Sequence, residues 1–158
     1  MSTNFREPGA EGVEERLKEL VIFKVAGLLC GLEALNVREI LRSQKVTPVY
    51  HAPEYVLGVV NLRGDIVTII DLQNKLGLDP DDSSQGRRNV IIVEYYGENV
   101  GLAVHQIQDI LQANVDQFEA PPSNLTALLG DYLSMVYKMT GKLVSVLNIE
   151  RLLDIEPQ

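Results

Sequence analysis

The sequence has one cysteine, no tryptophan and no long hydrophobic run. Cys30 stands alone among 158 residues, so no internal disulfide can form. The longest apolar runs, such as 57–60 and 90–93, fall far short of the ~20 residues that span a bilayer. Residues 1–20 are polar and acidic, unlike an apolar export signal. These features favour a soluble protein of the reducing cytoplasm.

Positive charge is also scarce in this chain. The 14 Lys and Arg residues face 22 Asp and Glu residues, which gives a formal net charge of -8. Phosphate backbones are bound by clustered Lys and Arg that release counterions, so nucleic acid is not an expected partner. The 46% hydrophobic content is enough to fill the interior of one domain, or of two small barrels that share one core.

Patterns for catalysis, phosphate binding and metal binding are absent from the sequence. His51 and His105 stand apart, and neither a Gly-x-Ser-x-Gly elbow nor a glycine-rich phosphate loop occurs. The acidic residues Asp79, Asp81 and Asp82 lack the glycine and the distal glutamate of a calcium loop. We therefore expect no catalytic residue, no metal site and no cofactor.

Short apolar or alternating runs of strand length fill most of the chain, closely punctuated by Gly and Pro. The expected strands are 20–25, 32–40, 46–49, 59–61, 66–70, 89–95, 100–104, 107–111 and 132–139. Helix-sized segments at 72–76 and 149–153 follow Asp71 and Asn148, whose side chains can cap a helix. Residues 117–130 are expected to form a connector. Short strands with few helices predict closed or partly closed barrels, because closure removes unpaired edges.

The two halves of the chain resemble each other. Gly27, Gly31, Leu32, Ile40 and Leu41 recur 70 positions later as Gly97, Gly101, Leu102, Ile110 and Leu111. Residues 64–72 likewise match 141–149, at an offset of 77. The alternative is that strand-rich sequences look alike, but duplication accounts better for both matches. We expect a flexible tail over 1–19 and a domain over 20–158, with a first barrel mainly at 20–78, a loop at 79–88 and a second barrel mainly at 89–153.

Two polar features interrupt these apolar runs. One is the segment 61–64, where Arg63 follows Asn61 and precedes Gly64. The other is Glu39, at the end of an expected strand, from which it could face Arg63 across the sheet. An exposed ion pair contributes only ~0–1 kcal/mol, so such a pair would serve mainly to specify a partner or a register. The alternative is that Asn61 and Gly64 only shape a hairpin and Arg63 points to water.

The order of these motifs resembles the CheW family of chemotaxis coupling proteins. The resemblance rests on 31–32 and 37–40, Pro53, Gly58, the Asn-Leu-Arg-Gly segment 61–64, 69–72, 101–102 and the proline pair 121–122. It extends from about residue 20 to residue 153. It implies a mostly β fold of two intertwined five-stranded SH3-like barrels with short capping helices, in agreement with the duplication.

The resemblance further implies a non-enzymatic adaptor in two-component signal transduction. It would couple the cytoplasmic tip of transmembrane chemoreceptors to the regulatory domain of a CheA-type histidine kinase. The adaptor would be cytoplasmic, recruited to receptor arrays and associated with the membrane only through receptors. Receptor binding would involve a groove near Val37, Glu39, Arg63, Gly101 and Ile107. Kinase binding would involve Gly58.

Two departures from the family pattern stand out. His105 takes a position where the family often has Asp, and 118–120 replaces a commonly basic stretch before the proline pair. Three other functions remain open at this point. They are a CheW-like adaptor of another chemosensory pathway such as type IV pilus motility, a small-ligand-binding barrel that uses the groove between the barrels, and a purely structural oligomer.

Overall fold

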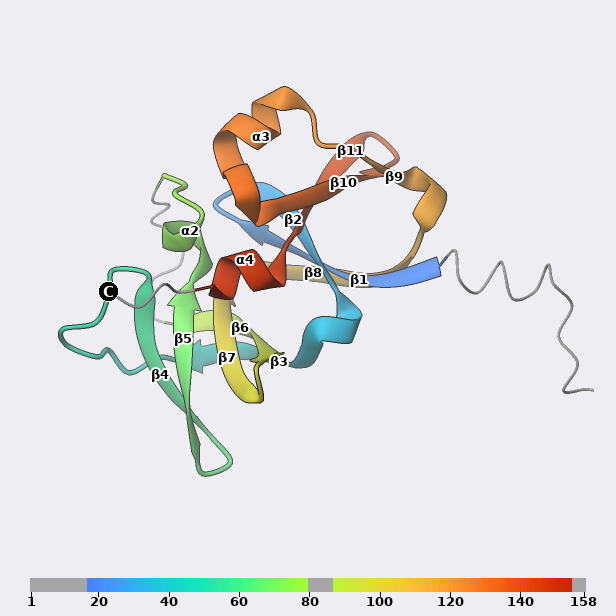
Figure 1. Cartoon of the computed structure of the whole chain (residues 1–158). Helices are drawn as coiled ribbons and strands as arrows, with labels where there is room; N and C mark the ends of the chain where they lie inside the picture. Colours follow the sequence, from blue (N-terminus) through green and yellow to red (C-terminus); the bar gives the residue numbers. More distant parts are fainter. Residues whose placement is uncertain (1–16, 80–86, 155–158) are drawn as a thin grey trace, which may run out of the picture.

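The computed structural model describes residues 17–79 and 87–154, which form two β-sheets with short helices around them (Figure 1). The strands are β1 (Leu17–Val25), β2 (Leu28–Glu33), β3 (Val37–Lys45), β4 (Val56–Leu62), β5 (Asp65–Asp71), β6 (Arg87–Tyr95), β7 (Glu98–Val104), β8 (Gln106–Asn114), β9 (Phe118–Glu119), β10 (Leu133–Met139) and β11 (Lys142–Leu147). The α-helices are α2 (Leu72–Lys75), α3 (Ser123–Leu129) and α4 (Ile149–Leu153), and the 3₁₀ turns are η1 (Ala34–Asn36), η2 (Val115–Gln117) and η3 (Gly130–Tyr132). None of the described helices is long and apolar enough to cross a membrane.

Each sheet takes strands from both halves of the chain. One sheet has the order β8-β1-β2-β11-β10-β9, and the other has the order β3-β6-β7-β5-β4. This exchange confirms the prediction of a mostly β fold in which two barrel-like units intertwine. The first sheet has six strands rather than five, because the two-residue β9 adds to it. Neither sheet therefore corresponds to one of the sequence halves 20–78 and 89–153, because each contains strands from both halves.

The register of the strand pairs repeats between the two halves. Leu20 pairs with Leu111 in one copy, and Val90 pairs with Leu41 in the other. In the same way, Gly31 pairs with Val146 in one copy, and Gly101 pairs with Ile69 in the other. The first two pairs are related by the offset of 70, and the last two by the offsets of 70 and 77 found in the sequence. The duplication is thus present in the backbone pairing, and β3 and β8 take equivalent places in the two copies.

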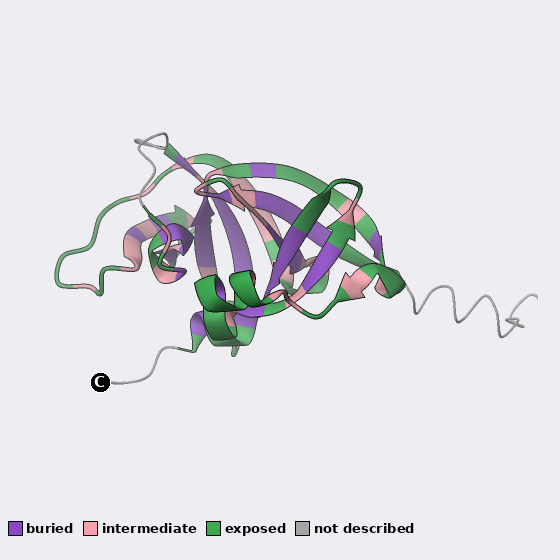
Figure 2. Cartoon of the chain, turned by 90° about the horizontal axis from the view of Figure 1, so that it is seen from above, coloured by how far each residue is buried: buried purple, intermediate pink, exposed green. Residues whose placement is uncertain are grey.

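One hydrophobic core lies between the sheets and receives side chains from both. Phe23 and Leu32 enter it from the six-stranded sheet, while Ile91 and Leu102 enter it from the five-stranded sheet. Leu152 of α4 covers it from one side. Figure 2 shows buried residues along strands of both sheets. Each sheet also encloses a smaller core cluster made only of its own strands. The side chains of the central core, in contrast, are buried only when both sheets are present.

Both predicted capping residues begin a helix. Asp71 Oδ1 accepts a hydrogen bond from the Gln73 N–H of α2 at 3.1 Å. Asn148 Oδ1 accepts one from the Arg151 N–H of α4 at 3.2 Å. The helices at 72–76 and 149–153 are therefore confirmed, the first one residue shorter than expected. Between them the expected connector at 117–130 contains a helix of its own, α3.

Three expectations were wrong or incomplete. The run 32–40 is not one strand: β2 ends at Glu33, η1 turns the chain, and β3 begins at Val37 in the other sheet. The run 46–49 forms no named strand and contributes only an isolated bridge from Thr47 to Val59. The expected tail is shorter, because residues 17–19 already belong to β1. Residues 1–16 and most of the expected loop at 79–88 lie outside the described residues.

Candidate partner-binding surface

The hairpin between β4 and β5 presents Arg63 on a tight turn. Arg63 and Gly64 both have positive φ, 51° and 91°, as a two-residue hairpin turn with matching twist requires. The Asn61 Oδ1 atom accepts a hydrogen bond from the Gly64 N–H at 2.9 Å, which fixes the turn. The Asn-Leu-Arg-Gly segment therefore shapes the hairpin and also orients the arginine.

Arg63 forms a two-pronged ion pair with Glu39 of β3. Its Nη2 atom lies 2.7 Å from Glu39 Oε1, and its Nη1 atom lies 3.2 Å from Glu39 Oε2. β3 and β4 are the two edge strands of the five-stranded sheet, so this pair joins its edges rather than neighbouring strands. The predicted approach of the two residues is confirmed, and Arg63 does not simply point to water.

The pair keeps both partners charged. The hydrogen bond from the Arg63 guanidinium lowers the pKa of the Glu39 carboxyl below its ordinary value, and partial desolvation opposes this effect. The same contact raises the pKa of Arg63. Because 70% of the Arg63 side chain is exposed, a partner can reach the pair from solvent.

Gly58 lies at the seam where the same two edges meet. The Thr47 N–H donates to the Val59 carbonyl at 2.9 Å, and the Val59 N–H donates to the Thr47 carbonyl at 2.8 Å. A Cβ atom on Gly58 would overlap the Thr47 carbonyl oxygen. The close main-chain approach expected at this glycine is therefore an approach of the chain to itself, and Gly58 is buried.

The remaining residues assigned to the receptor groove lie deeper. Gly101 is buried in β7, where a Cβ would overlap Ile69 Cδ1 and lie 2.8 Å from Val90 Cγ1. Ile107 is 9% exposed and belongs to the shared core, against which the half-buried Val37 also packs. The structure thus brings Glu39 and Arg63 together on the surface, places Val37 beside them on β3, and buries the other two.

A groove of about 440 Å³ runs beside β8, the edge strand of the six-stranded sheet. Ile22, Ile107, Leu111 and Met139 form its apolar walls, and polar residues including Asp109 line its rim. By the duplication, Asp109 stands where the other copy has Glu39, and Thr140 stands where it has Arg63. A threonine cannot reach across as an arginine can, so this copy keeps an open groove where the first has an ion pair.

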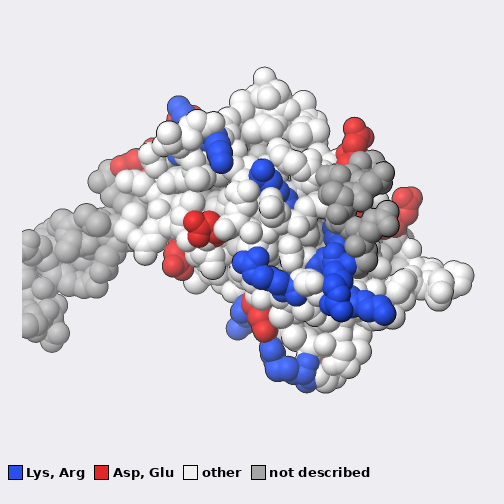
Figure 3. All heavy atoms as spheres, turned by 180° about the vertical axis from the view of Figure 1, so that it is seen from behind, with Lys and Arg blue, Asp and Glu red and all other residues white. Residues whose placement is uncertain are grey.

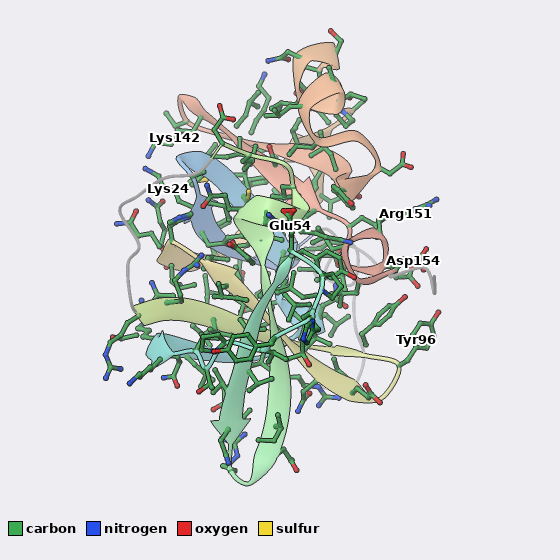
Figure 4. The ribbon with its side chains drawn as sticks, turned by 90° about the vertical axis from the view of Figure 1, so that its left-hand side faces the viewer. Lys24, Glu54, Tyr96, Lys142, Arg151 and Asp154 are labelled. Carbon is green, nitrogen blue, oxygen red and sulfur yellow. The ribbon has the colours of Figure 1, made fainter. Side chains whose placement is uncertain are left out.

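A second cleft, of about 420 Å³, lies where the ends of the two sheets meet. Its lining includes Tyr95, Tyr96, Glu33 and Glu94, and Figure 4 shows Tyr96 on the same side of the molecule as Asp154. Glu33 is 3.6 Å from Lys18, and Glu94 pairs with Arg38. Within the described part of the chain, no cluster of His, Cys, Asp and Glu could hold a metal ion.

Two polar features, one buried and one partly buried, were not predicted from the sequence. Arg88 is 8% exposed, and its Nη2 atom lies 3.6 Å from Asp71 Oδ1. The sequence did contain a signal for the buried arginine, because two consecutive arginines, 87 and 88, begin an apolar strand. Side chains alternate between the two faces of a strand, so one of the two must point inward. His105 accepts a hydrogen bond on Nδ1 from the Ala26 N–H at 2.9 Å, which ties the β1–β2 turn to the β7–β8 connection.

Comparison with known proteins agrees with this geometry. The sequence profile of the CheW-like domain matches residues 19–156. The chain is 31% identical over 140 residues to the chemotaxis protein CheW of Klebsiella aerogenes, covering 88% of this chain and 83% of that protein. It is 26% identical over 139 residues to the chemotaxis protein CheW of Bacillus subtilis, covering 88% of each. The crystal structure of the scaffolding protein TtCheW from Thermoanaerobacter tengcongensis superposes with a TM-score of 0.77 at 28% identity, over 87% of this chain and 93% of that one. The chain therefore belongs to the CheW-like domain family.

Proposed function

We propose that this chain is a non-enzymatic chemotaxis adaptor that couples chemoreceptors to a CheA-type histidine kinase in the cytoplasm. The observation that carries the proposal is the match of the CheW-like domain to residues 19–156, nearly the whole described chain. It is supported by relatives named as chemotaxis and scaffolding proteins that align over most of their own length. The adaptor reaches the inner face of the membrane only through the receptors that recruit it.

Receptor binding is assigned to the surface around the Glu39–Arg63 pair. Val37 lies two residues before Glu39 on β3, so an apolar contact adjoins a charged one. An amphipathic receptor helix would place its apolar stripe along Val37, and the ion pair would select its polar edge. The buried Ile107 would act indirectly, through the shared core against which Val37 packs. Gly101 would act indirectly, by allowing Ile69 and Val90 to pack beneath the surface.

Kinase binding is assigned to the edge of the five-stranded sheet near Gly58. This glycine would act through the backbone path it permits, because its own atoms are buried against Thr47. A larger residue at this position would separate β4 from Thr47 and change the shape of the edge that the kinase contacts. The effect on kinase binding would therefore accompany a local change of structure.

Reconstitution with receptor-bearing membranes and the cognate kinase tests the proposal. We expect the chain to raise kinase autophosphorylation and to make it sensitive to attractant. Arg63→Glu should weaken this coupling while the melting temperature stays nearly unchanged. Lys138→Glu is the matched control, because it breaks an exposed ion pair with Glu119 on the other sheet. Unchanged kinase activity with all components folded would contradict the proposal.

A further inference from the structure

One end of the β3–β6 strand pair concentrates positive charge on an otherwise acidic protein. Arg42 and Lys45 of β3 are exposed, as is Arg87 of β6. Figure 3 shows Lys and Arg side chains gathered on this face of the molecule. No carboxylate among the described residues forms an ion pair with any of the three. We call these three residues the basic patch.

The basic patch includes an unfavourable pair of like charges. Lys45 and Arg87 are direct cross-strand partners in the antiparallel pairing of β3 and β6. Like charges placed opposite each other destabilise a sheet. The fold gives no reason for a second cation at Lys45, opposite Arg87, and an external anionic group would remove the repulsion.

A bulge next to the patch is held in place by specific contacts. The register of β3 shifts between Leu41 and Gln44, and Ser43 has a φ of 56°. The Ser43 N–H donates to Asn89 Oδ1 at 3.0 Å, and Arg87 Nη1 donates to the Ser43 carbonyl at 2.6 Å. A bulge redirects the side chains beside it. The orientation of Arg42 and Arg87 thus follows from a defined local structure.

The second copy of the fold shows that the charges are not needed to form this strand pair. The equivalent strands β8 and β1 pair in continuous register at this end, without a bulge. The place of Lys45 opposite Arg87 is taken there by Asn114 opposite Leu17. Gln112 corresponds to Arg42 at the offset of 70. The same architecture therefore forms with neutral and apolar residues, and the basic patch is a feature added to one copy.

We propose that the basic patch is a docking site for a carboxylate-rich segment of a partner protein. The net charge of -8 repels long polyanions and anionic membranes at a distance. Three clustered cations can still attract a short acidic segment at contact range, where local complementarity decides the choice of partner. Two of the three patch residues lie on β3, the strand that also carries Glu39, but the patch does not depend on the proposed adaptor function.

Titration of the ¹⁵N-labelled full chain with an octaglutamate peptide tests this site. We expect amide shifts confined to residues 41–45 and 87–89, and an affinity that weakens as salt is added. The variant R42E/K45E/R87E should bind the peptide about tenfold more weakly or worse, because three exposed attractive contacts become repulsive. The control K138E/K142E/R151E carries the same change of charge on the six-stranded sheet and α4, where Figure 4 labels Lys142 and Arg151. It should retain most of the binding.

Several outcomes would overturn the proposal. Absence of shifts at low salt, or shifts centred elsewhere, would show that the patch does not dock acidic segments. Equal loss of peptide binding in both triple variants would show that binding depends on the net charge of the protein and not on the basic patch. Tighter binding to anionic vesicles than to the peptide, lost in the patch variant alone, would identify a membrane contact instead. If charge reversal impairs folding, the neutral variant R42Q/K45Q/R87Q replaces it, and unchanged peptide affinity in that variant would equally reject the site.

Discussion

At the scale of single residues, the Glu39–Arg63 pair acts through charge rather than through stability. Arg63→Ala should raise the pKa of the Glu39 carboxyl toward its ordinary value, because the hydrogen bond that lowers it is lost. In the unchanged protein the contribution of the pair is present above the ordinary pKa of glutamate and is lost as pH falls through the lowered folded value. The side-chain carboxyl chemical shift of Glu39, followed against pH, measures this.

The control for that titration is Lys138→Ala, which removes an exposed pair with Glu119 and leaves the hairpin of Arg63 untouched. It should leave the titration of Glu39 unchanged. A Glu39 pKa that stays lowered after Arg63→Ala would show that another group holds the carboxylate in solution. Melting temperatures of both variants should remain close to that of the unchanged protein, since exposed pairs add only ~0–1 kcal/mol.

The buried glycines Gly31 and Gly101 occupy equivalent positions but have different surroundings. A Cβ on Gly101 would overlap Ile69 Cδ1 and approach Val90 Cγ1 to 2.8 Å, whereas one on Gly31 would meet Val144 Cγ1 at 2.9 Å. Gly101→Ala should lower the free energy of unfolding by about 2 kcal/mol, and Gly31→Ala by about 1 kcal/mol. Urea unfolding measures both. Unchanged stability together with lost receptor binding in Gly101→Ala would mean that this glycine contacts the receptor directly.

At the scale of elements, the caps of α2 and α4 differ in one respect. Asp71 both caps α2 and lies 3.6 Å from the buried Arg88, while Asn148 only caps α4. Asp71→Asn keeps an oxygen for the cap but removes the partner of a buried charge. It should cost about 2 kcal/mol of unfolding free energy. Asn148→Asp, the matched control, should change it by less than about 0.5 kcal/mol, and equal effects would rule out the ion pair as the cause.

Some elements of the fold could be predicted from the sequence and others could not, for physical reasons. The segments 72–76 and 149–153 were predicted because Asp71 and Asn148 are local capping signals. The run 32–40 was misread because apolar residues that serve two different sheets look continuous in the sequence. Leu35 of the intervening turn is 93% exposed, which hydrophobicity alone cannot reveal.

The candidate site was likewise only partly predictable. The approach of Glu39 to Arg63 was inferred because each residue interrupts an apolar run. The basic patch was not inferred, because it depends on the pairing of Lys45 with Arg87 across strands far apart in the chain. The buried position of Gly58 was also beyond reach, since it depends on the register of an isolated bridge from Thr47 to Val59.

At the scale of the whole molecule, exchange of strands makes the two sheets depend on each other. β1 and β2 leave the first half to join β8 and β11, and β6 and β7 leave the second half to join β3 and β5. The shared core then links both sheets through residues such as Phe23 and Ile91. We expect the described domain to unfold as one cooperative unit, although its two sequence halves resemble each other.

Cys30 offers a direct measurement of this cooperativity. It is fully buried in β2, and burial raises the pKa of its thiol to about 12. Labelling by a thiol reagent near pH 8 therefore requires the chain to open. The folded state therefore holds the Cys30 proton more tightly than the unfolded state does. The contribution of this thiol to the free energy of unfolding is fully present below the unfolded thiol pKa of about 8.5, and it is lost as pH rises toward about 12.

Gly101→Ala lies in the five-stranded sheet, whereas Cys30 lies in the six-stranded sheet. If the sheets unfold together, a loss of about 2 kcal/mol at Gly101 should accelerate labelling of Cys30 about 30-fold, in step with the change in global stability. Gly31→Ala, beside Cys30 in β2, should accelerate the labelling of Cys30 by a smaller factor, because it lowers the free energy of unfolding by a smaller amount. If Gly101→Ala lowers global stability but leaves the labelling rate unchanged, the sheets open separately, and the strand exchange does not couple them.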